Sequence, residues 1–334
     1  MTAFDRAAEA AALTHHDRLA KPPGSLGRLE VLGAQLAGMA GTCPPPIPAP
    51  AAVAVFAGDH GVVASGVTPW PQAITAAMVS TFASGRAAVN AIARQVGAEV
   101  TVVDVGVACP YPPSANVVDR KVRPGTDDLS VGPAMSVAEA QAALDVGRDV
   151  ATSLIAAGNR CLITGDMGIG NTTPSAAVIA ALTGTDPVDA TGRGTGIDDV
   201  MLATKQRIVT LAVARAIGMP PVELLADIGG LEIAALAGYV LGAAAAGVPV
   251  ILDGVIALAG AVVAVAIEPS SRDFLVAGHR SVEPAASAAL AHLSLVPLLD
   301  LDLRLGEGTG ALLALPLVQA AARVLNEMAT LDEL

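Results

Sequence analysis

Short apolar runs of strand length alternate along the chain with longer segments of helical periodicity. The runs are rich in valine, isoleucine, leucine and alanine and carry few charges, which is typical of strands buried on both faces. Helical segments separate consecutive runs, as expected for parallel strands joined by crossover helices. We therefore predict strands at residues 51–56, 100–104, 161–164, 250–252 and 274–277.

Polar or glycine-rich loops follow most of these predicted strands. They occupy residues 58–61, 165–173, 253–254 and 278–281. In a parallel sheet the carboxyl ends of the strands meet at one edge, and ligands bind at that edge. The pattern therefore favours an α/β fold, a parallel sheet with helices on both faces in a Rossmann-like three-layer architecture, with its ligand site beside these loops.

The loop at residues 165–173 joins a predicted strand to a predicted helix. Thr173 is the expected N-cap of that helix, Pro174 its first residue and Gly184 its stop signal. Unpaired amides at a helix start, together with the positive end of the helix dipole, attract anions. We hypothesise that this loop binds the phosphate of a phosphorylated substrate. The alternative is a tight turn with a structural role only.

A second glycine-rich loop lies at residues 191–199, and an amphipathic helical pattern follows it as far as Gly218. Asp198 and Asp199 suit the first turn of this helix electrostatically. Lys205 lies about two turns into the helix on the face of Asp198, where its ammonium can reach an anion held at the loop. The alternative is a solvated lysine on the surface.

Glu307 stands between Gly306 and Gly308, directly ahead of an apolar helical segment at residues 311–324. Apolar surroundings would desolvate its carboxylate and raise the pKa, as a general base working near neutrality requires. The alternative is an exposed glutamate in a turn at a helix start.

The charge balance limits the possible partners. The chain has 334 residues, with 31 acidic against 19 basic side chains and a formal net charge of −12. Only 2% of the residues are aromatic, so platforms for base stacking are scarce. We expect no nucleic-acid partner. An anionic substrate must instead be bound by local amides and a few cations.

Other features bear on cellular location and on metal binding. Cys43, Cys109 and Cys161 are widely separated, so we expect neither a disulfide framework nor a CxxC metal site. The N-terminal residues lack a secretory pattern, which favours a cytoplasmic location. The uncharged segment 234–252 is long enough to span a bilayer, but its Gly-Pro break favours a helix followed by a buried strand, and we expect no membrane partner.

Two further segments are expected to be irregular. The proline-rich residues 43–50 predict an extended connector between an N-terminal helical region and the first strand. Residues 111–133 predict a surface excursion without a chemical role.

Neither glycine-rich loop matches a known nucleotide-binding signature. Thr173 and Ile197 stand where the GxGxxG pattern has its third glycine, and no GxxxxGK[ST] motif is present in the sequence. A Rossmann-type oxidoreductase and a nucleotide-binding protein without catalytic activity remain as alternatives.

Several motifs together resemble those of the nicotinate-nucleotide:dimethylbenzimidazole phosphoribosyltransferase family. The resemblance runs in the expected order from Lys21 to beyond Gly310. It implies transfer of phosphoribose from nicotinate mononucleotide to dimethylbenzimidazole, giving nicotinate and α-ribazole phosphate for the lower ligand of cobalamin. The matching motifs lie at residues 21–27, 59–61, 71–72, 165–173, 192–199, 279–284 and 306–310.

The resemblance also implies roles for individual residues. Glu307 is then the general base that removes a proton from the attacking base. Asp166 matches a second catalytic acidic position, which the family usually fills with the longer glutamate. The implied phosphate and nucleotide contacts are Gly168, Gly170, Asn171, Thr172, Gly194, Lys205 and Ser281, and the implied base contacts are Gln72, Met167 and Leu305.

The same resemblance implies an enzyme that needs neither a cofactor nor a metal. Its substrates are expected to be nicotinate mononucleotide and dimethylbenzimidazole or a related base. A homodimer is expected, in which each chain has a large α/β catalytic domain at residues 41–304. Residues 1–40 together with 305–334 are expected to form a small helical lobe from both chain ends.

Overall fold

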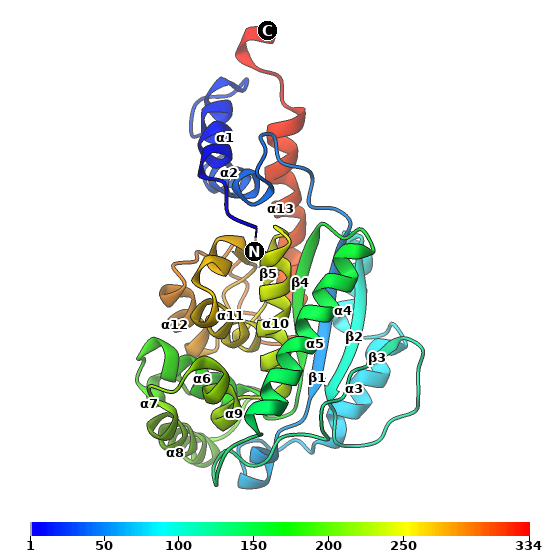
Figure 1. Ribbon diagram of the computed structural model, residues 1–334, viewed down its shortest axis with the longest axis vertical. Coiled ribbons are helices and arrows are strands. Elements are labelled where there is room, and N and C mark those ends of the chain that lie inside the picture. The colour runs from blue at the N-terminus through cyan, green and yellow to red at the C-terminus, as the bar shows by residue number, and fades with distance from the viewer. Residues whose placement is uncertain (1) are drawn as a thin grey trace.

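A six-stranded sheet lies at the centre of the computed structural model, which describes residues 2–334. Every pair of neighbouring strands in it is parallel, which confirms the predicted α/β fold. The strands are β1 (Ala51–Gly58), β2 (Ala98–Gly106), β3 (Val117–Asp119), β4 (Cys161–Met167), β5 (Val250–Leu252) and β6 (Leu275–Ala277). Their order across the sheet is β3-β2-β1-β4-β5-β6 (Figure 1).

The strand order reverses between β1 and β4. From β1 the chain builds outward through β2 and β3, then returns to place β4 against the other side of β1, with Val53 opposite Ile163. The loops that leave β1 and β4 therefore diverge toward opposite faces of the sheet. In sheets of this order a crevice opens at that reversal, outside the carboxyl ends of the strands, and ligands bind in it.

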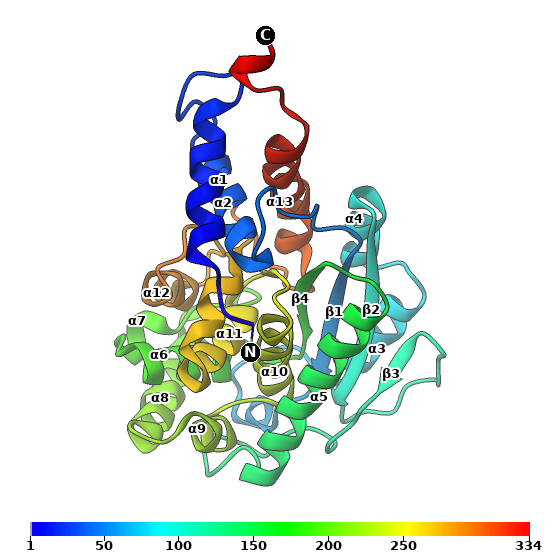
Figure 2. The same cartoon turned by 45° about the horizontal axis from the view of Figure 1, so that its top comes forward.

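Helices cover both faces of the sheet, as Figures 1 and 2 show. Alternate side chains of β1 enter two separate cores: Phe56 belongs to one and Val55 to the other. This arrangement confirms the predicted three layers. Helices of the first core are α5 (Val137–Ala156), α6 (Thr172–Thr183), α8 (Asp199–Ala216), α9 (Pro221–Ile228), α10 (Leu231–Ala245), α11 (Val255–Ile267) and α12 (Pro284–His292), and those of the second include α3 (Ala73–Ala83), α4 (Ala88–Val96) and α13 (Thr309–Glu327).

Helices α5 and α10 cross in backbone contact on the first face. A Cβ atom added to Gly147 would lie 1.8 Å from the carbonyl oxygen of Ala235, and one added to Gly238 would lie 1.8 Å from that of Leu144. Any side chain at either position would force the helices apart. The abundant alanine and glycine of this region therefore allow unusually close packing of helix on helix.

A small helical lobe extends beyond one end of the sheet (Figures 1 and 2). It consists of α1 (Arg6–Arg18), α2 (Arg28–Ala40) and the far half of α13, which meet around Ala12, Ala34 and Leu325. The near half of α13 packs on the sheet instead, because Leu312 and Leu315 belong to the second core. Helix α13 therefore connects the lobe to the sheet.

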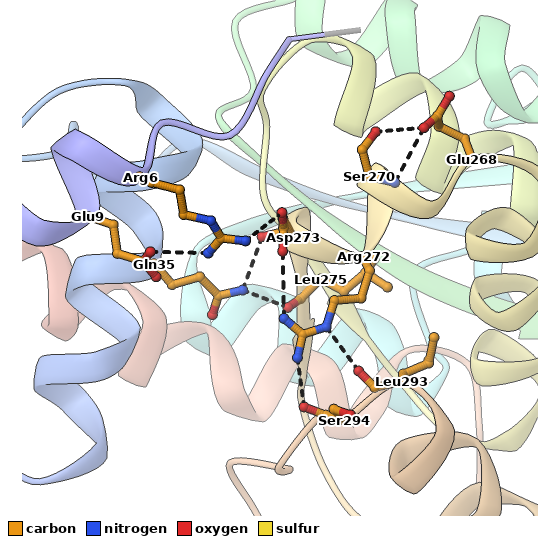
Figure 3. A network of polar contacts seen from close by, with 10 residues as sticks. All are labelled: Arg6, Glu9, Gln35, Glu268, Ser270, Arg272, Asp273, Leu275, Leu293 and Ser294. Atoms are coloured by element: carbon orange, nitrogen blue, oxygen red, sulfur yellow. Dashed lines mark hydrogen bonds and ion pairs between the residues drawn. The ribbon is translucent and has the colours of Figure 1, made fainter.

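Polar contacts join this lobe to the segment that precedes β6 (Figure 3). The guanidinium of Arg6 lies between Glu9 and Asp273, at 3.1 and 3.0 Å. The amide of Gln35 donates to the carbonyl oxygens of Asp273 and Leu275 at 3.2 and 3.1 Å. Because β6 is an edge strand, Gln35 occupies backbone acceptors that would otherwise be open to another chain.

The segment considered as a membrane span has the predicted alternative structure. It forms the buried helix α10 followed by strand β5. Among residues 2–334, α13 is the one helix that is long and apolar enough to cross a membrane, but 56% of its most apolar stretch is buried inside the protein. Buried core helices of other proteins have the same length and composition.

Some boundaries and one element differ from the sequence predictions. The interval 111–133 contains strand β3, which pairs with β2 from Val102 to Asp104. Its three residues are too few to show a pattern in sequence.

Helix α6 begins at Thr172 after the N-cap Asn171, so the predictions of Thr173 as N-cap and Pro174 as first residue were wrong by two positions. Gly170, at φ 87°, turns the chain into the helix sooner than expected. The remaining elements are η1 (Gly61–Ser65), α7 (Pro187–Ala190), η2 (Pro269–Phe274) and η3 (Leu331–Glu333).

Candidate active site

A cavity of about 220 Å³ opens at the carboxyl ends of β4, β5 and β6. The loops after these strands form its walls, and residues 304–307 close one side. This is the edge at which the sequence pattern placed the ligand site. The predicted site residues that line it are Asp166, Met167, Gly168, Asn171, Thr172, Gly194, Ser281, Leu305 and Glu307.

The remaining predicted site residues lie in two other places. Gly170 and Lys205 line a smaller hollow of about 50 Å³, which shares Gly168, Thr172 and Gly194 with the main cavity. Gln72 lines neither space, and its side-chain amide donates to the carbonyl oxygen of His60 at 2.7 Å. From the same part of the chain, the cavity is lined by Met78 on α3.

Glu307 is held at the cavity wall by a turn of unusual conformation. Gly306, Glu307 and Gly308 have φ angles of 83°, 64° and 94°, all in the left-handed region. The glutamate is the one residue of the three for which this conformation is costly. Its side chain is 6% exposed, and Oε2 accepts a hydrogen bond from the amide of Val89 at 3.3 Å.

The surroundings of Glu307 alter its affinity for protons. Burial raises the pKa of its carboxyl above the ordinary value, and the nearby carboxylate of Asp253 adds to the rise, while the Val89 amide opposes it. A carboxylate with a raised pKa is a stronger base than one in water. Glu307 can therefore accept a proton from a ligand in the cavity.

Asp166 ends β4 on the other side of the same turn. Its Oδ2 accepts from the amide of Asn171 at 3.0 Å, whereas Oδ1 is buried without a partner among the described residues. A Cβ atom added to Gly306 would lie 3.3 Å from each of these oxygens. Burial raises the pKa of Asp166 well above the ordinary value, and the charges of Asp253 and Glu232 add to the rise. Asp166 is therefore far easier to protonate than an exposed aspartate.

Lys205 is buried and its ammonium contacts both glycine-rich loops. Its side chain is 1% exposed, so it is not the solvated lysine of the alternative interpretation. Nζ donates to Thr172 Oγ1 at 2.8 Å and to the carbonyl oxygen of Gly192 at 2.9 Å. Burial lowers the pKa of the ammonium to about 8, although the Glu283 carboxylate opposes this effect. An ammonium has three donors, so one is left for a ligand.

Glu283 occupies a donor that the sequence interpretation assigned to phosphate. Its Oε1 accepts from the amide of Gly194 at 2.8 Å. A Cβ atom added to Gly192 would lie 2.2 Å from its Oε2, so glycine is required there. The carboxylate thus fixes the loop at residues 192–196 when no ligand is bound. Sequence reasoning did not single out Glu283, although it lies in one of the motifs that carry the family resemblance.

Two acid–histidine pairs are buried next to residues that line the cavity. His60 Nε2 lies 2.9 Å from Glu232 Oε1, and both side chains are fully buried. His279 Nε2 lies 3.4 Å from Asp253 Oδ1. The sequence pattern marked the polar loops that contain His60, Asp253 and His279 without giving these residues a role, whereas Glu232 lies in the first turn of α10 and was missed.

Comparisons with known proteins agree along the whole chain. A family profile described as phosphoribosyltransferase matches residues 1–334. A nicotinate-nucleotide–dimethylbenzimidazole phosphoribosyltransferase of Salinispora tropica is 56% identical, over 98% of this chain and 95% of the relative. One of Roseiflexus castenholzii with the same name is 49% identical, over 99% of this chain and 94% of the relative.

A solved structure gives the same result. The crystal structure of CobT from Thermus thermophilus superposes with a TM-score of 0.95 at 48% identity, and the match covers 98% of both chains. Identity at this level over nearly full length establishes common ancestry as well as a common fold. This chain therefore belongs to the family of nicotinate-nucleotide–dimethylbenzimidazole phosphoribosyltransferases.

Proposed function

We propose that this chain transfers phosphoribose from nicotinate mononucleotide to dimethylbenzimidazole, with Glu307 as the general base. Relatives that match this chain over nearly their whole length carry the name of this enzyme. The observation that carries the assignment of the base is the burial of Glu307 at the cavity wall, across from the glycine-rich loops. A basic carboxylate and glycine-rich loops that line one cavity suit an acceptor base and a phosphorylated donor.

The mononucleotide phosphate is proposed to bind where the two spaces meet. The start of α6 supplies the backbone amide of Thr172 and the positive end of a helix dipole, and the Lys205 ammonium lies beside it; Pro174 has no amide proton, and the Thr173 amide donates to the carbonyl oxygen of Gly170. Gly168 and Gly170 allow close approach to the backbone, and Gly194 and Ser281 complete the walls. The ribose then extends toward Glu307.

The acceptor base is proposed to occupy the apolar part of the cavity. Met167, Leu305 and Met78 supply aliphatic surface there. Gln72 does not line this part of the cavity, because its side-chain amide is hydrogen-bonded to the backbone of His60. We propose that Gln72 affects the base only indirectly, by holding the loop after β1 in place.

The reaction then follows from these positions. Glu307 removes the N–H proton of the benzimidazole, and the other ring nitrogen attacks the anomeric carbon of the ribose. The bond from that carbon to the nicotinate ring nitrogen breaks, and its electron pair leaves with nicotinate, whose ring becomes neutral. Positive charge develops on the ribose in between, and Asp166 is proposed to stabilise this charge when its carboxyl is ionised. Direct displacement inverts the anomeric carbon.

The test is product formation by the purified chain and by Glu307→Gln. Chromatography should detect nicotinate and the ribosylated base in equal amounts from the parent protein. Glu307→Gln should lower kcat by about 100-fold or more, because general-base catalysis contributes a factor of ~10²–10⁴. Binding of the mononucleotide, measured by calorimetry, should persist.

Glu327→Gln is a matched control, since this exposed glutamate lies at the far end of α13. It should leave both kcat and binding unchanged. Full turnover by Glu307→Gln would remove Glu307 from the role of base, and release of nicotinate without a ribosylated base would indicate a hydrolase.

The organisation of the chain is also proposed. We propose a large catalytic domain at residues 41–304, against which the near half of α13 also packs, and a small lobe of residues 1–40 and the far half of α13. We likewise keep a homodimer located in the cytoplasm. Light scattering tests the dimer directly, because it should give twice the 33.1 kDa of one chain.

A further inference from the structure

Asp253 is a buried residue next to the cavity, and its carboxylate takes no part in the reaction proposed above. It follows β5, and its side chain is 1% exposed. Its backbone amide donates to Thr164 Oγ1 at 2.9 Å, which fixes the residue against β4. A buried charge of this kind is costly unless several donors compensate it.

The donors come from the turn that carries Glu307. Asp253 Oδ2 accepts from the amide of Gly308 at 3.2 Å, and Oδ1 accepts from the amide of Ala311 at 3.0 Å. These amides belong to the N-cap and the third residue of α13. Asp253 therefore caps α13 from a distant part of the chain, where the helix has no side-chain cap of its own.

His279 supports the same carboxylate from the opposite side. Its Nε2 lies 3.4 Å from Asp253 Oδ1, and its ring lies against the backbone of α13, since a Cβ atom added to Gly310 would lie 2.0 Å from His279 Cδ2. Asp253 thus touches the helix that follows Glu307 and the histidine that packs against that helix. Without it, the turn that holds Glu307 in a costly left-handed conformation would lose the two hydrogen bonds that tie it to β5.

We propose that Asp253 is the positioning residue for the general base: its carboxylate holds the turn at residues 306–308, and through it the Glu307 side chain, in the reactive orientation. The proposal rests on the function proposed above for Glu307. Asp253 acts through the turn and touches neither substrate.

The proposal has an electrostatic consequence that a purely structural role lacks. The charge of Asp253 contributes to the raised pKa of Glu307. The other groups near Glu307 are the Asp166 carboxyl in β4 and the Val89 amide at the start of α4, and His279, Glu283 and Arg304 line the same cavity. Asp253 also raises the pKa of His279. Asp253→Asn leaves these groups in place and removes one negative charge. Glu307 then loses its proton at lower pH.

The experiment compares Asp253→Asn with the parent protein in kcat, in mononucleotide binding and in the pH profile of kcat. We expect kcat to fall about 10- to 100-fold, since a misplaced catalytic group costs up to ~10²-fold. The dissociation constant of nicotinate mononucleotide should change less than about twofold, and the acid limb of the kcat profile should move to lower pH.

Asp104→Asn is the matched control. Asp104 is another fully buried aspartate near the carboxyl end of a strand, and it accepts from the amides of Gly106 and Val107 at 3.0 and 2.9 Å. It does not line the cavity. Its substitution should leave kcat and the acid limb unchanged even if thermal stability falls.

The results separate this proposal from the proposed function. Unchanged kcat in Asp253→Asn overturns the positioning role, and so does a parallel loss of kcat and binding with an unmoved acid limb. If Glu307→Gln keeps its turnover, the general-base assignment itself fails. If Asp253→Asn does not fold, Thr164→Val decides, because it removes only the hydroxyl that holds the Asp253 amide: a smaller fall in kcat with intact binding supports the role, and an unchanged kcat overturns it.

Discussion

Several ionisable side chains are buried around the cavity, where they are shielded from water. Glu307 and Asp166 have raised pKa values because burial disfavours their charged forms, and Lys205 has a lowered pKa for the same reason. Such shifts are typical of functional sites. They also make the behaviour of these residues dependent on pH.

Lys205→Ala should weaken binding of nicotinate mononucleotide by roughly 10-fold or more, since a charge-assisted hydrogen bond to phosphate contributes about 1.5–3 kcal/mol. In the parent protein, affinity should fall as the pH rises through about 8, because the ammonium then loses its charge. Calorimetric titrations from neutral to alkaline pH measure both effects. Lys121→Ala, a lysine paired with Asp104 outside the cavity, is the control. Equal affinities for Lys205→Ala and the parent would place the phosphate elsewhere.

Asp166→Asn should stabilise the protein while lowering its activity. The folded-state pKa of Asp166 lies above its unfolded value, so the ionised group destabilises the fold as the pH rises above that unfolded value. The neutral amide avoids this cost and can still accept from Asn171. Thermal melts should show a larger rise in Tm near pH 8 than near pH 4. A lower Tm at both pH values would show that the ionised carboxylate is compensated in the fold.

The sequence identified much of the cavity wall but not its supports. The glycine-rich loops that precede α6 and α8 identified positions such as Gly168 and Gly194, which line the cavity, because such loops have a local pattern. Glu283 was missed, and Asp253 was marked only as part of a polar loop, because their partners, Gly194 and Gly308, lie far away in sequence. Gln72 was expected to contact the base because it lies in a family motif, but its side-chain amide donates to the carbonyl oxygen of His60 instead. Side-chain direction is not encoded locally.

At the scale of elements, the strands and helices followed from periodicity wherever the pattern was long or strongly apolar. The short strand β3 was missed because its pairing with β2 depends on tertiary structure. The start of α6 moved because one residue, Gly170, adopts a positive φ angle. Element type was therefore predictable, whereas exact ends depended on turns.

Close contact between α5 and α10 gives a prediction at this scale. Gly147→Ala should lower the free energy of unfolding by about 2 kcal/mol or more, because its Cβ would overlap the carbonyl oxygen of Ala235 and force the helices apart. Chemical denaturation measures the change. Gly132→Ala is the control, since no atom lies within 4 Å of its Cβ position. If Gly147→Ala lowered the free energy of unfolding no more than Gly132→Ala does, the close contact between α5 and α10 would not contribute to stability.

At the scale of the whole molecule, an acidic protein binds an anionic substrate. The net charge of −12 repels the mononucleotide at long range, while the buried Lys205 attracts it only at short range. Salt screens exposed charges, and the Debye length falls from about 30 Å at 0.01 M to about 8 Å at 0.15 M ionic strength.

The kcat/KM for the mononucleotide should therefore rise modestly, by less than about 10-fold, across this range of ionic strength. The kcat/KM for the uncharged acceptor base should stay constant and is the control. Steady-state rates at several salt concentrations test this expectation. A steep fall would reveal exposed cations that guide the substrate.

The position of the 306–308 turn along the chain has a consequence for biosynthesis. A ribosome completes the loops at residues 165–173 and 192–196 long before it adds this turn and α13. Domains tend to fold from the N-terminal side as they emerge. A nascent chain that stalls before residue 306 thus has both glycine-rich loops but lacks the proposed general base and the α13 residues of the second core. Such a truncated chain is expected to make no product.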